Sequence, residues 1–508
     1  MEEKNVNFKY DFNYSFIKIN DSKFKVYAHK NELLNHHIIK TLKIFNILLD
    51  RDVIFNFYND FYKMGLINLD YDEFLGIINN AIEFHDIGKL SFNFQINRLN
   101  KYNYNVKSVQ EKILHNNNLD KIISHLEINH SFISALSFIS KNKGKLNDLI
   151  ILILTYVILG HHTNIKDIVE EDDIFYNSFD ENKKITLKFF SKFLKMDIGN
   201  QYSFQKFEDN GTNFLKSKKN ELNSSFSFFY MYIYSLLITA DVIASDNYNK
   251  SIKEIDFNKS NKRIDSNLAL KIHNSFYEKD YNKYLKNRKF GMLNFNFDTN
   301  NINDLRTMML LESSNRLLNS IKKHDSKRIF FLNMPTGGGK TNTSMKLALD
   351  LIENTNVNRI IYAMPFINII EQNYDSICKT YGLNEEKGEI RKIYSASENI
   401  YENKSSEEKL EIIMDDDFFN YPVICTTFVS LFNCIIKNQK KYKYRLNAIA
   451  NSVIILDEIQ SLPLKNWNSL YYLINELSAK YNIYFIIMSA TLPDFNKLKL
   501  DHENIVFL

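Results

Sequence analysis

The first half of the chain concentrates side chains that can bind metal ions. Nine of the twelve histidines lie between His29 and His162, and His85-Asp86 stands in the string FHDIGK after an apolar helical pattern. Neighbouring imidazole and carboxylate groups can offer nitrogen and oxygen ligands to a pair of metal ions, with the carboxylate bridging them. One such pair is more often structural, so the interpretation depends on further ligands elsewhere.

Four further segments supply candidate ligands, each beside or inside an apolar run. They are His36, His130, the pair His161-His162 after Gly160, and Asp241 at the end of a long aromatic run. A buried aspartate needs a partner, and a metal ion would be one. The simpler interpretations are a solvent-facing aspartate and hydrogen-bonded histidines, and His37 or His125 are alternatives to the histidines chosen.

The second half contains a glycine-rich loop of a different chemistry. The string runs from Asn333 through Pro335, Thr336, Gly337, Gly338 and Gly339 to Lys340 and Thr341, after an apolar strand and before a helical pattern. Such a loop directs backbone N–H groups at phosphates, while the lysine reaches the β- and γ-phosphates and the threonine hydroxyl binds Mg²⁺. Met334 stands where the usual first glycine belongs. The simpler interpretation is a glycine turn.

Carboxylates follow another apolar strand further along. Asp457 and Glu458 come directly after Val453–Leu456, and Gln460 follows them. At the end of a strand in an open parallel sheet, both carboxylates would face the ligand crevice. Asp457 would then hold Mg²⁺ through its water shell, and Glu458 would orient the attacking water.

The elements around these residues predict two different architectures. Residues 1–246 show helical apolar stripes, as in 33–49, and are expected to form an all-α domain. Residues 247–302 are expected to connect the parts. Residues 303–508 carry short apolar runs separated by helical sequence, which predicts an α/β lobe with a mainly parallel sheet; the runs are 329–332, 360–364, 423–425, 453–456 and 485–488.

The overall composition excludes several classes of protein. With 44% hydrophobic and 24% charged residues, the chain is not disordered. Its net charge is only +4, so a nucleic acid would have to bind to a local group of basic residues. Three cysteines without a ligand spacing favour a reducing compartment. The start carries no apolar signal core, and the apolar run 226–240 is short for a membrane span, so we expect a cytoplasmic protein with buried core helices.

The order of the motifs resembles two known families. PTGGGKT, DEIQ and the Ser489-Ala490-Thr491 string look like the ATP-binding lobe of a superfamily 2 helicase, and the histidine–aspartate series resembles the HD nuclease domain. An HD domain followed by this lobe resembles the CRISPR-associated helicase-nuclease of type I systems.

This resemblance implies two metal sites that share Asp86. One would consist of His36, His85, Asp86 and Asp241, and the other of Asp86, His130, His161 and His162. Mixed nitrogen and oxygen ligands suit Mn, Fe, Co or Ni better than Mg²⁺. Lys89 is a candidate phosphate-facing cation, with a solvated lysine as the simpler alternative.

The resemblance also assigns roles in the helicase lobe. Gln460 and Ser489 with Thr491 would couple the nucleotide state to nucleic acid, and Thr426 with Thr427 would contact the backbone of a single strand unless they are ordinary strand threonines. The family closes ATP between two lobes, and the second lobe supplies an arginine finger that can be worth about 10³–10⁵ in rate. The sequence stops at Leu508, so we expect either a separate chain carrying the second lobe or a truncated product.

The resulting hypothesis is a metal-dependent single-stranded DNA endonuclease fused to an ATP-dependent helicase lobe. It would be recruited by an RNA-guided type I surveillance complex in antiviral defence. The alternatives are an HD phosphohydrolase of small nucleotides with a regulatory ATPase lobe, and a truncated, non-catalytic chain that binds DNA or the complex.

Overall fold

The computed structural model divides the chain into two compact units. The first contains Met1–Leu49 and Tyr58–Phe257, and the second contains Asp50–Phe57 and Asn258–Leu508. The residues that the structure describes are 16–19, 22–29, 31–90, 94–95, 130–165, 201–217, 224–247, 256–286, 300–323, 327–394, 406–489 and 505–508.

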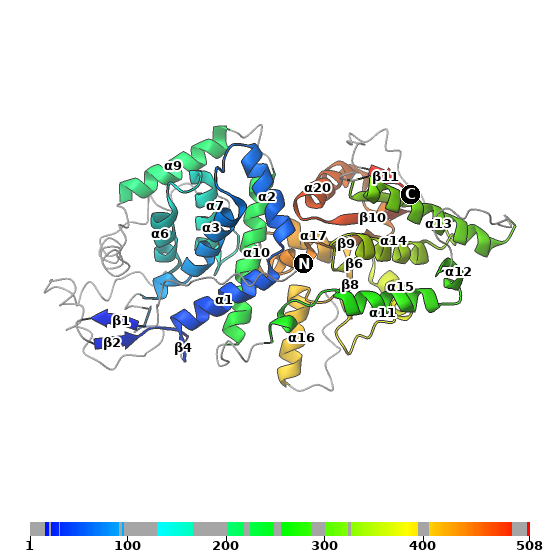
Figure 1. Cartoon of the computed structure of the whole chain (residues 1–508), viewed down its shortest axis with the longest axis horizontal. Helices are drawn as coiled ribbons and strands as arrows, with labels where there is room; N and C mark the ends of the chain where they lie inside the picture. The colour runs from blue at the N-terminus through cyan, green and yellow to red at the C-terminus, as the bar shows by residue number, and fades with distance from the viewer. Residues whose placement is uncertain are drawn as a thin grey trace. The chain divides into compact units, whose positions relative to one another are not determined.

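The described part of the first unit is helical, with two short hairpins before the helices (Figure 1). The hairpins pair β1 (Phe16–Ile19) with β2 (Ser22–Lys25), and β3 (Tyr27–His29) with β4 (Glu32–Leu33). The helices are α1 (Leu34–Leu48), α2 (Arg51–Lys63), α3 (Tyr71–Phe84), α6 (His130–Asn142), α7 (Asp148–Gly160), α9 (Gln201–Ser217) and α10 (Ser225–Asp246), with a 3-10 turn η1 (Ile87–Leu90) after α3. Residues 51–57 of α2 belong to the second unit.

Apolar patterning explains how these helices pack. The stripe Leu34, Ile38, Leu42 and Phe45 predicts the buried face of α1, and all four side chains are buried. Helix α7 is apolar on every side, so it is surrounded by protein and contacts α3, α6, α9 and α10. Helix α10 lies along both α1 and α7.

Helix α10 also has the length and composition of a membrane span. It is 22 residues long, more than the sequence pattern indicated, but 83% of its most apolar window is buried inside the protein. A buried carboxylate, Asp241, lies on this helix. Both observations favour a core helix.

The second unit contains a seven-stranded parallel sheet with the order β11-β5-β10-β9-β6-β8-β7. Each of the five expected strands is present. The strands are β5 (Ile329–Asn333), β6 (Ile360–Met364), β7 (Ile390–Ile393), β8 (Val423–Thr427), β9 (Val453–Leu456), β10 (Tyr484–Ser489) and β11 (Ile505–Phe507). The short strand β7 is charged and at one edge of the sheet, and neither it nor β11 was expected.

Helices connect and cover these strands, as expected for parallel neighbours (Figure 1). Helix α11 lies in the segment expected to connect the two parts, yet its Ile272 and Phe276 belong to the apolar core of this unit. The longer helices are α11 (Ser266–Glu278), α13 (Ile302–Lys322), α14 (Lys340–Asn354), α15 (Ile367–Tyr381), α16 (Ser406–Phe418), α17 (Phe428–Ile436) and α20 (Trp467–Lys480). The shorter ones include α12 (Lys283–Lys286), α18 (Lys440–Lys443) and α19 (Leu446–Ile449).

Candidate functional site

The histidine–aspartate pair stands where α3 ends. His85 is the residue that ends the helix, and Asp86 follows it at the start of the turn η1, where its carboxylate is fully buried. The turn needs a glycine at position 88, because a Cβ atom there would lie 2.0 Å from the His130 carbonyl oxygen. The close approach brings the start of α6, and therefore His130, against Asp86.

One set of ligands lies on the inner side of Asp86. His37 Nε2 lies 3.1 Å from Asp86 Oδ2 and 3.2 Å from Asp241 Oδ1, and His85 Nε2 lies 3.4 Å from Asp86 Oδ2. His37, His85, Asp86 and Asp241 are all buried, and their ligand atoms lie within 4.8 Å of one another. Three predicted residues therefore meet here.

The fourth residue of this set corrects the sequence prediction. His36 is exposed on α1, and the adjacent His37 points into the cluster. The helical period explains why His37 is buried and His36 is not. Position 37 lies one turn after Leu34 and next to Ile38 on the buried side of α1, whereas position 36 lies on the opposite face. The apolar stripe of 33–49 was thus a signal that could have selected His37.

A second set of ligands lies on the other oxygen of Asp86. His130 Nε2 is 3.1 Å and His161 Nε2 is 3.6 Å from Asp86 Oδ1, and His130 Nε2 is 2.8 Å from His162 Nε2. These four residues also place their ligand atoms within 4.8 Å of one another. His162 is exposed and His130 is partly exposed, so this set borders solvent while the first set is enclosed.

The donors fit divalent cations. The Nδ1 of His85 lies 2.7 Å from the Ile82 carbonyl and that of His161 lies 2.6 Å from the Ile158 carbonyl, so each Nδ1 donates a proton and each Nε2 faces the cluster. Among the described residues, His37 Nε2, His85 Nε2 and both Asp86 oxygens are buried without a hydrogen bond of good geometry. Buried polar atoms of this kind call for a bound ion.

Charges within the cluster change its proton affinities. Burial lowers the pKa of His37, but Asp241, Asp86 and Glu32 outweigh it and raise the pKa to about 10. His85 follows the same pattern, with Asp86 the main opposing group, and its pKa rises to about 9. Burial raises the pKa of the Asp86 carboxyl, but Lys89 and His85 hold it well below its usual range. The rings of His37 and His85 are therefore protonated without a metal ion, and a cation that binds their nitrogen atoms would have to displace these protons.

Lys89 is the other cation at this centre. Its Nζ lies 2.6 Å from Asp86 Oδ2, and the residue is only 4% exposed, so the alternative of a solvated lysine is wrong. The Phe94 ring centroid lies 5.5 Å from the same nitrogen. Lys89 therefore contributes a positive charge to the cluster itself.

The glycine loop connects β5 to α14. Gly337 and Gly339 have φ of 78° and 88°, a backbone conformation that glycine adopts without strain. Lys340 begins α14, with Thr341 next to it, and the loop lines a cleft of about 810 Å³ that also includes Arg306 and Tyr281. Pro335, Thr336 and Gly337 are exposed. The loop therefore presents backbone groups at the start of a helix, as phosphate binding requires.

The predicted carboxylates lie at the end of β9, near this loop. Lys340 Nζ is 3.2 Å from Glu458 Oε1, and burial with the nearby Glu458 charge raises the pKa of Asp457 to about 6. Gln460 contacts Glu458 and accepts a hydrogen bond from Ser489 Oγ at 2.7 Å. This chain of contacts links the ends of β9 and β10. Thr491 lies outside the described residues.

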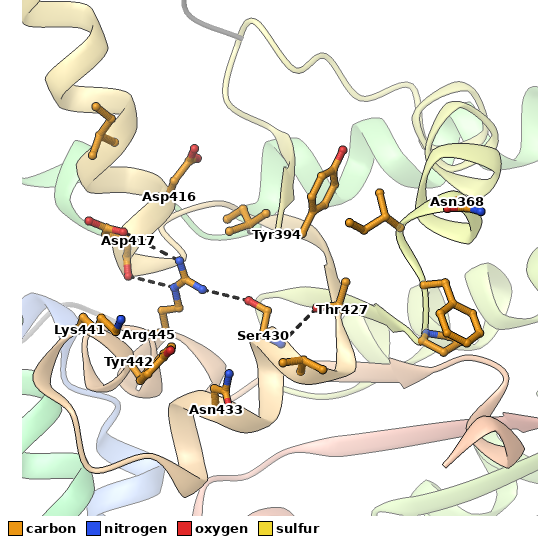
Figure 2. Close-up of a pocket in the computed structure, with 16 residues that line it drawn as sticks. Asn368, Tyr394, Asp416, Asp417, Thr427, Ser430, Asn433, Lys441, Tyr442 and Arg445 are labelled. Carbon is orange, nitrogen blue, oxygen red and sulfur yellow. Dashed lines mark hydrogen bonds and ion pairs between the residues drawn. The ribbon is translucent and has the colours of Figure 1, made fainter. Parts of the chain in front are cut away.

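A second cleft of about 1020 Å³ lies beside the ends of β6, β7 and β8 (Figure 2). Thr427 lines it and caps α17, because its Oγ1 accepts from Ser430 N at 3.1 Å. Thr426 does not reach this cleft: it is fully buried and donates to the Ile393 carbonyl at 2.7 Å. The expected contact of Thr426 with a nucleic-acid strand is therefore wrong, because alternate side chains of a strand point to opposite faces.

Fold and sites together define a helical HD domain joined to a RecA-like helicase lobe. Residues 23–249 match the family model of the Cas3 HD domain, and residues 308–494 match the model of the type III restriction enzyme res subunit. The chain thus carries a Cas3-type HD domain followed by a helicase-like domain. Domains of both types are hydrolases.

Similar proteins include two CRISPR-associated nuclease/helicases and a solved Cas3 structure. A CRISPR-associated nuclease/helicase Cas3 of Haloferax volcanii is 28% identical over 177 residues, which cover 32% of this chain and 19% of that protein. A putative CRISPR-associated nuclease/helicase Cas3 of Methanocaldococcus jannaschii is 29% identical over 188 residues, covering 36% and 26%. The crystal structure of T. fusca Cas3 matches with a TM-score of 0.54 at 14% identity, covering 94% of this chain and 50% of that one. The chain spans about half the length of that solved relative.

Proposed function

We propose that the HD domain of this chain is a metal-dependent nuclease that hydrolyses single-stranded DNA. The observation that carries the proposal is the shared position of Asp86, whose two carboxylate oxygens each face a separate set of ligands. A carboxylate in that position suits two adjacent cations, and two-metal centres are typical of nucleases.

Particular residues would hold each cation. His37, His85, Asp86 and Asp241 would hold the enclosed one, and Asp86, His130, His161 and His162 the one near solvent. Bound cations would polarise the scissile phosphate and supply a water-derived nucleophile at neutral pH. The nitrogen-rich ligand sets favour Mn, Fe, Co or Ni over Mg²⁺.

The chain's own groups prepare the centre for that chemistry. The carbonyls of Ile82 and Ile158 fix the rings of His85 and His161, so neither ring needs to reorient when a cation binds. The partial exposure of His130 and His162 favours substrate approach from their side. Lys89 is the cation available to a phosphate oxygen once its contact with Asp86 is exchanged.

For the helicase lobe we propose binding of ATP with Mg²⁺. Pro335 to Thr341 would surround the phosphates, with Lys340 released from Glu458 to contact them. Asp457 would hold Mg²⁺, and Glu458 would orient the attacking water. The contact between Gln460 and Ser489 would transmit the nucleotide state toward a strand lying in the cleft beside Thr427.

The named relatives suggest the biological setting. Both curated matches are CRISPR-associated nuclease/helicases. We propose that this chain acts in the cytoplasm, with an RNA-guided type I surveillance complex that delivers the DNA.

The decisive experiment is cleavage of circular single-stranded DNA by the full chain with Mn²⁺, Co²⁺, Ni²⁺ or Mg²⁺, with and without ATP. We expect nicking with the transition metals without ATP, and its loss in Asp86→Ala. His36→Ala, which alters the exposed face of helix α1 beside His37, is the control that should retain activity. Cleavage by Asp86→Ala at the parent rate would refute the site. Hydrolysis of small nucleotides with intact DNA would favour a phosphohydrolase instead.

A further inference from the structure

A buried carboxylate outside both ligand sets contacts the enclosed one. Glu32 lies in β4, in the hairpin before α1, and is 3% exposed. Its Oε2 lies 3.3 Å from His37 Nδ1, the ring nitrogen opposite the one that faces Asp86 and Asp241. The two atoms are at ion-pair distance, and among the described residues neither makes a hydrogen bond of good geometry. His37 therefore stands between a carboxylate behind it and the cluster in front of it.

His37 needs such a partner because of where it lies in its helix. His85 and His161 stand at helix ends, where carbonyls lack amide partners, so their Nδ1 atoms bond to the carbonyls of Ile82 and Ile158. His37 is the fourth residue of α1, and the carbonyls behind it accept bonds from the next helical turn. An acceptor for its Nδ1 has to come from another element, and the β3–β4 hairpin supplies Glu32.

The charge on Glu32 is balanced inside the protein. Lys40, one turn after His37 and 2% exposed, places Nζ 2.7 Å from Glu32 Oε1 and 3.0 Å from the Asn247 carbonyl. Asn247 is the residue that ends α10, the helix that carries Asp241. The ion pair thus links the hairpin and α1 to the helix that provides another ligand.

The hairpin is also fixed to the turn that follows Asp86. Gln95 accepts from Tyr27 N at 3.0 Å and donates to the Tyr27 carbonyl at 2.8 Å and the Lys89 carbonyl at 2.7 Å. Strand β3 is therefore held against η1, which limits the movement of Glu32 relative to the cluster.

A different assignment is a third cation site, since His29, Glu32 and His37 also place ligand atoms within 4.8 Å of one another. Two observations oppose it. His29 Nε2 is 3.9 Å from Glu32 and 3.3 Å from Ser245 Oγ, and the ammonium of Lys40 already occupies one side of Glu32. A divalent ion there would meet a buried positive charge.

We propose that Glu32 is the positioning residue of the enclosed metal site: its carboxylate faces His37 Nδ1 and, once a cation is bound at Nε2, would accept the Nδ1 proton and hold the ring in that orientation. The inference rests on the proposed function, because it assumes that the HD centre binds two cations. Carboxylate partners of this kind typically contribute 10–100-fold to metal affinity.

The test is Mn²⁺ binding by the full chain, with stoichiometry from elemental analysis and affinities from calorimetry. We expect two ions for the parent and, for Glu32→Gln, about 10–100-fold weaker binding of one ion with the other unchanged. Retention of that second ion shows that the variant is folded. His29→Asn should bind both ions as the parent does, and Glu32→Asp, which keeps the charge, should lose less affinity than Glu32→Gln.

Each result separates the possibilities. The positioning role would be overturned if Glu32→Gln bound Mn²⁺ as tightly as the parent. It would also be overturned if Glu32→Asp bound Mn²⁺ more weakly than Glu32→Gln. A third ion in the parent that His29→Asn loses would replace it with a cation site. A parent chain that binds no pair of ions would instead overturn the proposed nuclease centre.

Discussion

The HD centre and the glycine loop differ in how they satisfy charge. In the HD centre, residues from α1, α6 and α10, from the ends of α3 and α7 and from the turn η1 meet, and Lys89 and protonated histidines balance Asp86 and Asp241. At the glycine loop, which lines a cleft, Gly337 is exposed and Lys340 contacts Glu458 at the end of β9. Under the proposed function, the first site would hold cations and the second would exchange a charged ligand.

The largest effect is expected for replacement of His37, and replacement of its neighbour His36 in α1 should have almost none. His37→Ala should reduce the bound metal from two ions to about one and slow single-stranded DNA cleavage by about a thousandfold, since a metal ion can contribute several kcal/mol to the transition state. Metal content and nicking rate measure this. His36→Ala should resemble the parent, and a larger defect in His36→Ala than in His37→Ala would reverse the assignment.

Lys340→Ala should affect the other site alone. Loss of a charge-assisted contact to phosphate should weaken ATP binding by about 10–100-fold, while metal-dependent nicking without ATP stays unchanged. Titration with a fluorescent ATP analogue gives the affinity. If nucleotide binding is unaltered, the glycine loop is not the phosphate site.

Replacing Gly88 or Gly76 by alanine tests how tightly the chain is packed around the HD centre. Gly88→Ala should lower the free energy of unfolding by about 1–3 kcal/mol, because its Cβ would overlap the His130 carbonyl. Gly76→Ala, in α3 with nothing within 4 Å of the added Cβ, should be neutral or stabilise by up to about 1 kcal/mol. Thermal denaturation of both variants checks this, and equal melting temperatures would contradict the close approach at Gly88.

The two sites should also differ in how their ligand affinity depends on pH. Raised pKa values of about 10 for His37 and about 9 for His85 mean that both rings are protonated at pH 7 without metal, so cations must displace protons. Metal affinity should therefore rise with pH, by about tenfold per unit for each proton displaced. At the glycine loop, Asp457 is ionised above its pKa of about 6, so Mg²⁺-dependent nucleotide binding should fall below pH 6 and level off above it.

Calorimetry at pH 5.5, 6.5 and 7.5 would measure both trends on the same protein. The contrast is lost if HD metal affinity is already constant above pH 6, since the histidines would then be neutral in the metal-free centre.

Local sequence determined much of the second unit. Strands that are buried on both faces read as short apolar runs, and parallel strands end at one edge of the sheet. The positions of Lys340, Asp457 and Ser489 near that edge therefore followed from the motifs and the fold class. Edge strand β7 was not predicted, because a charged, partly paired strand lacks the apolar signal.

The HD centre depended more on tertiary structure. Residue types and spacing in the sequence indicated His85, Asp86, His130, His161, His162 and Asp241, but the prediction chose His36 although the helical period favours its neighbour His37. The resemblance to the HD family included Gln95, but nothing in the sequence alone linked Glu32 or Lys40 to these ligands. These residues act through contacts between elements far apart in the chain, and such contacts exist only once the hairpin, α1 and α10 have packed together.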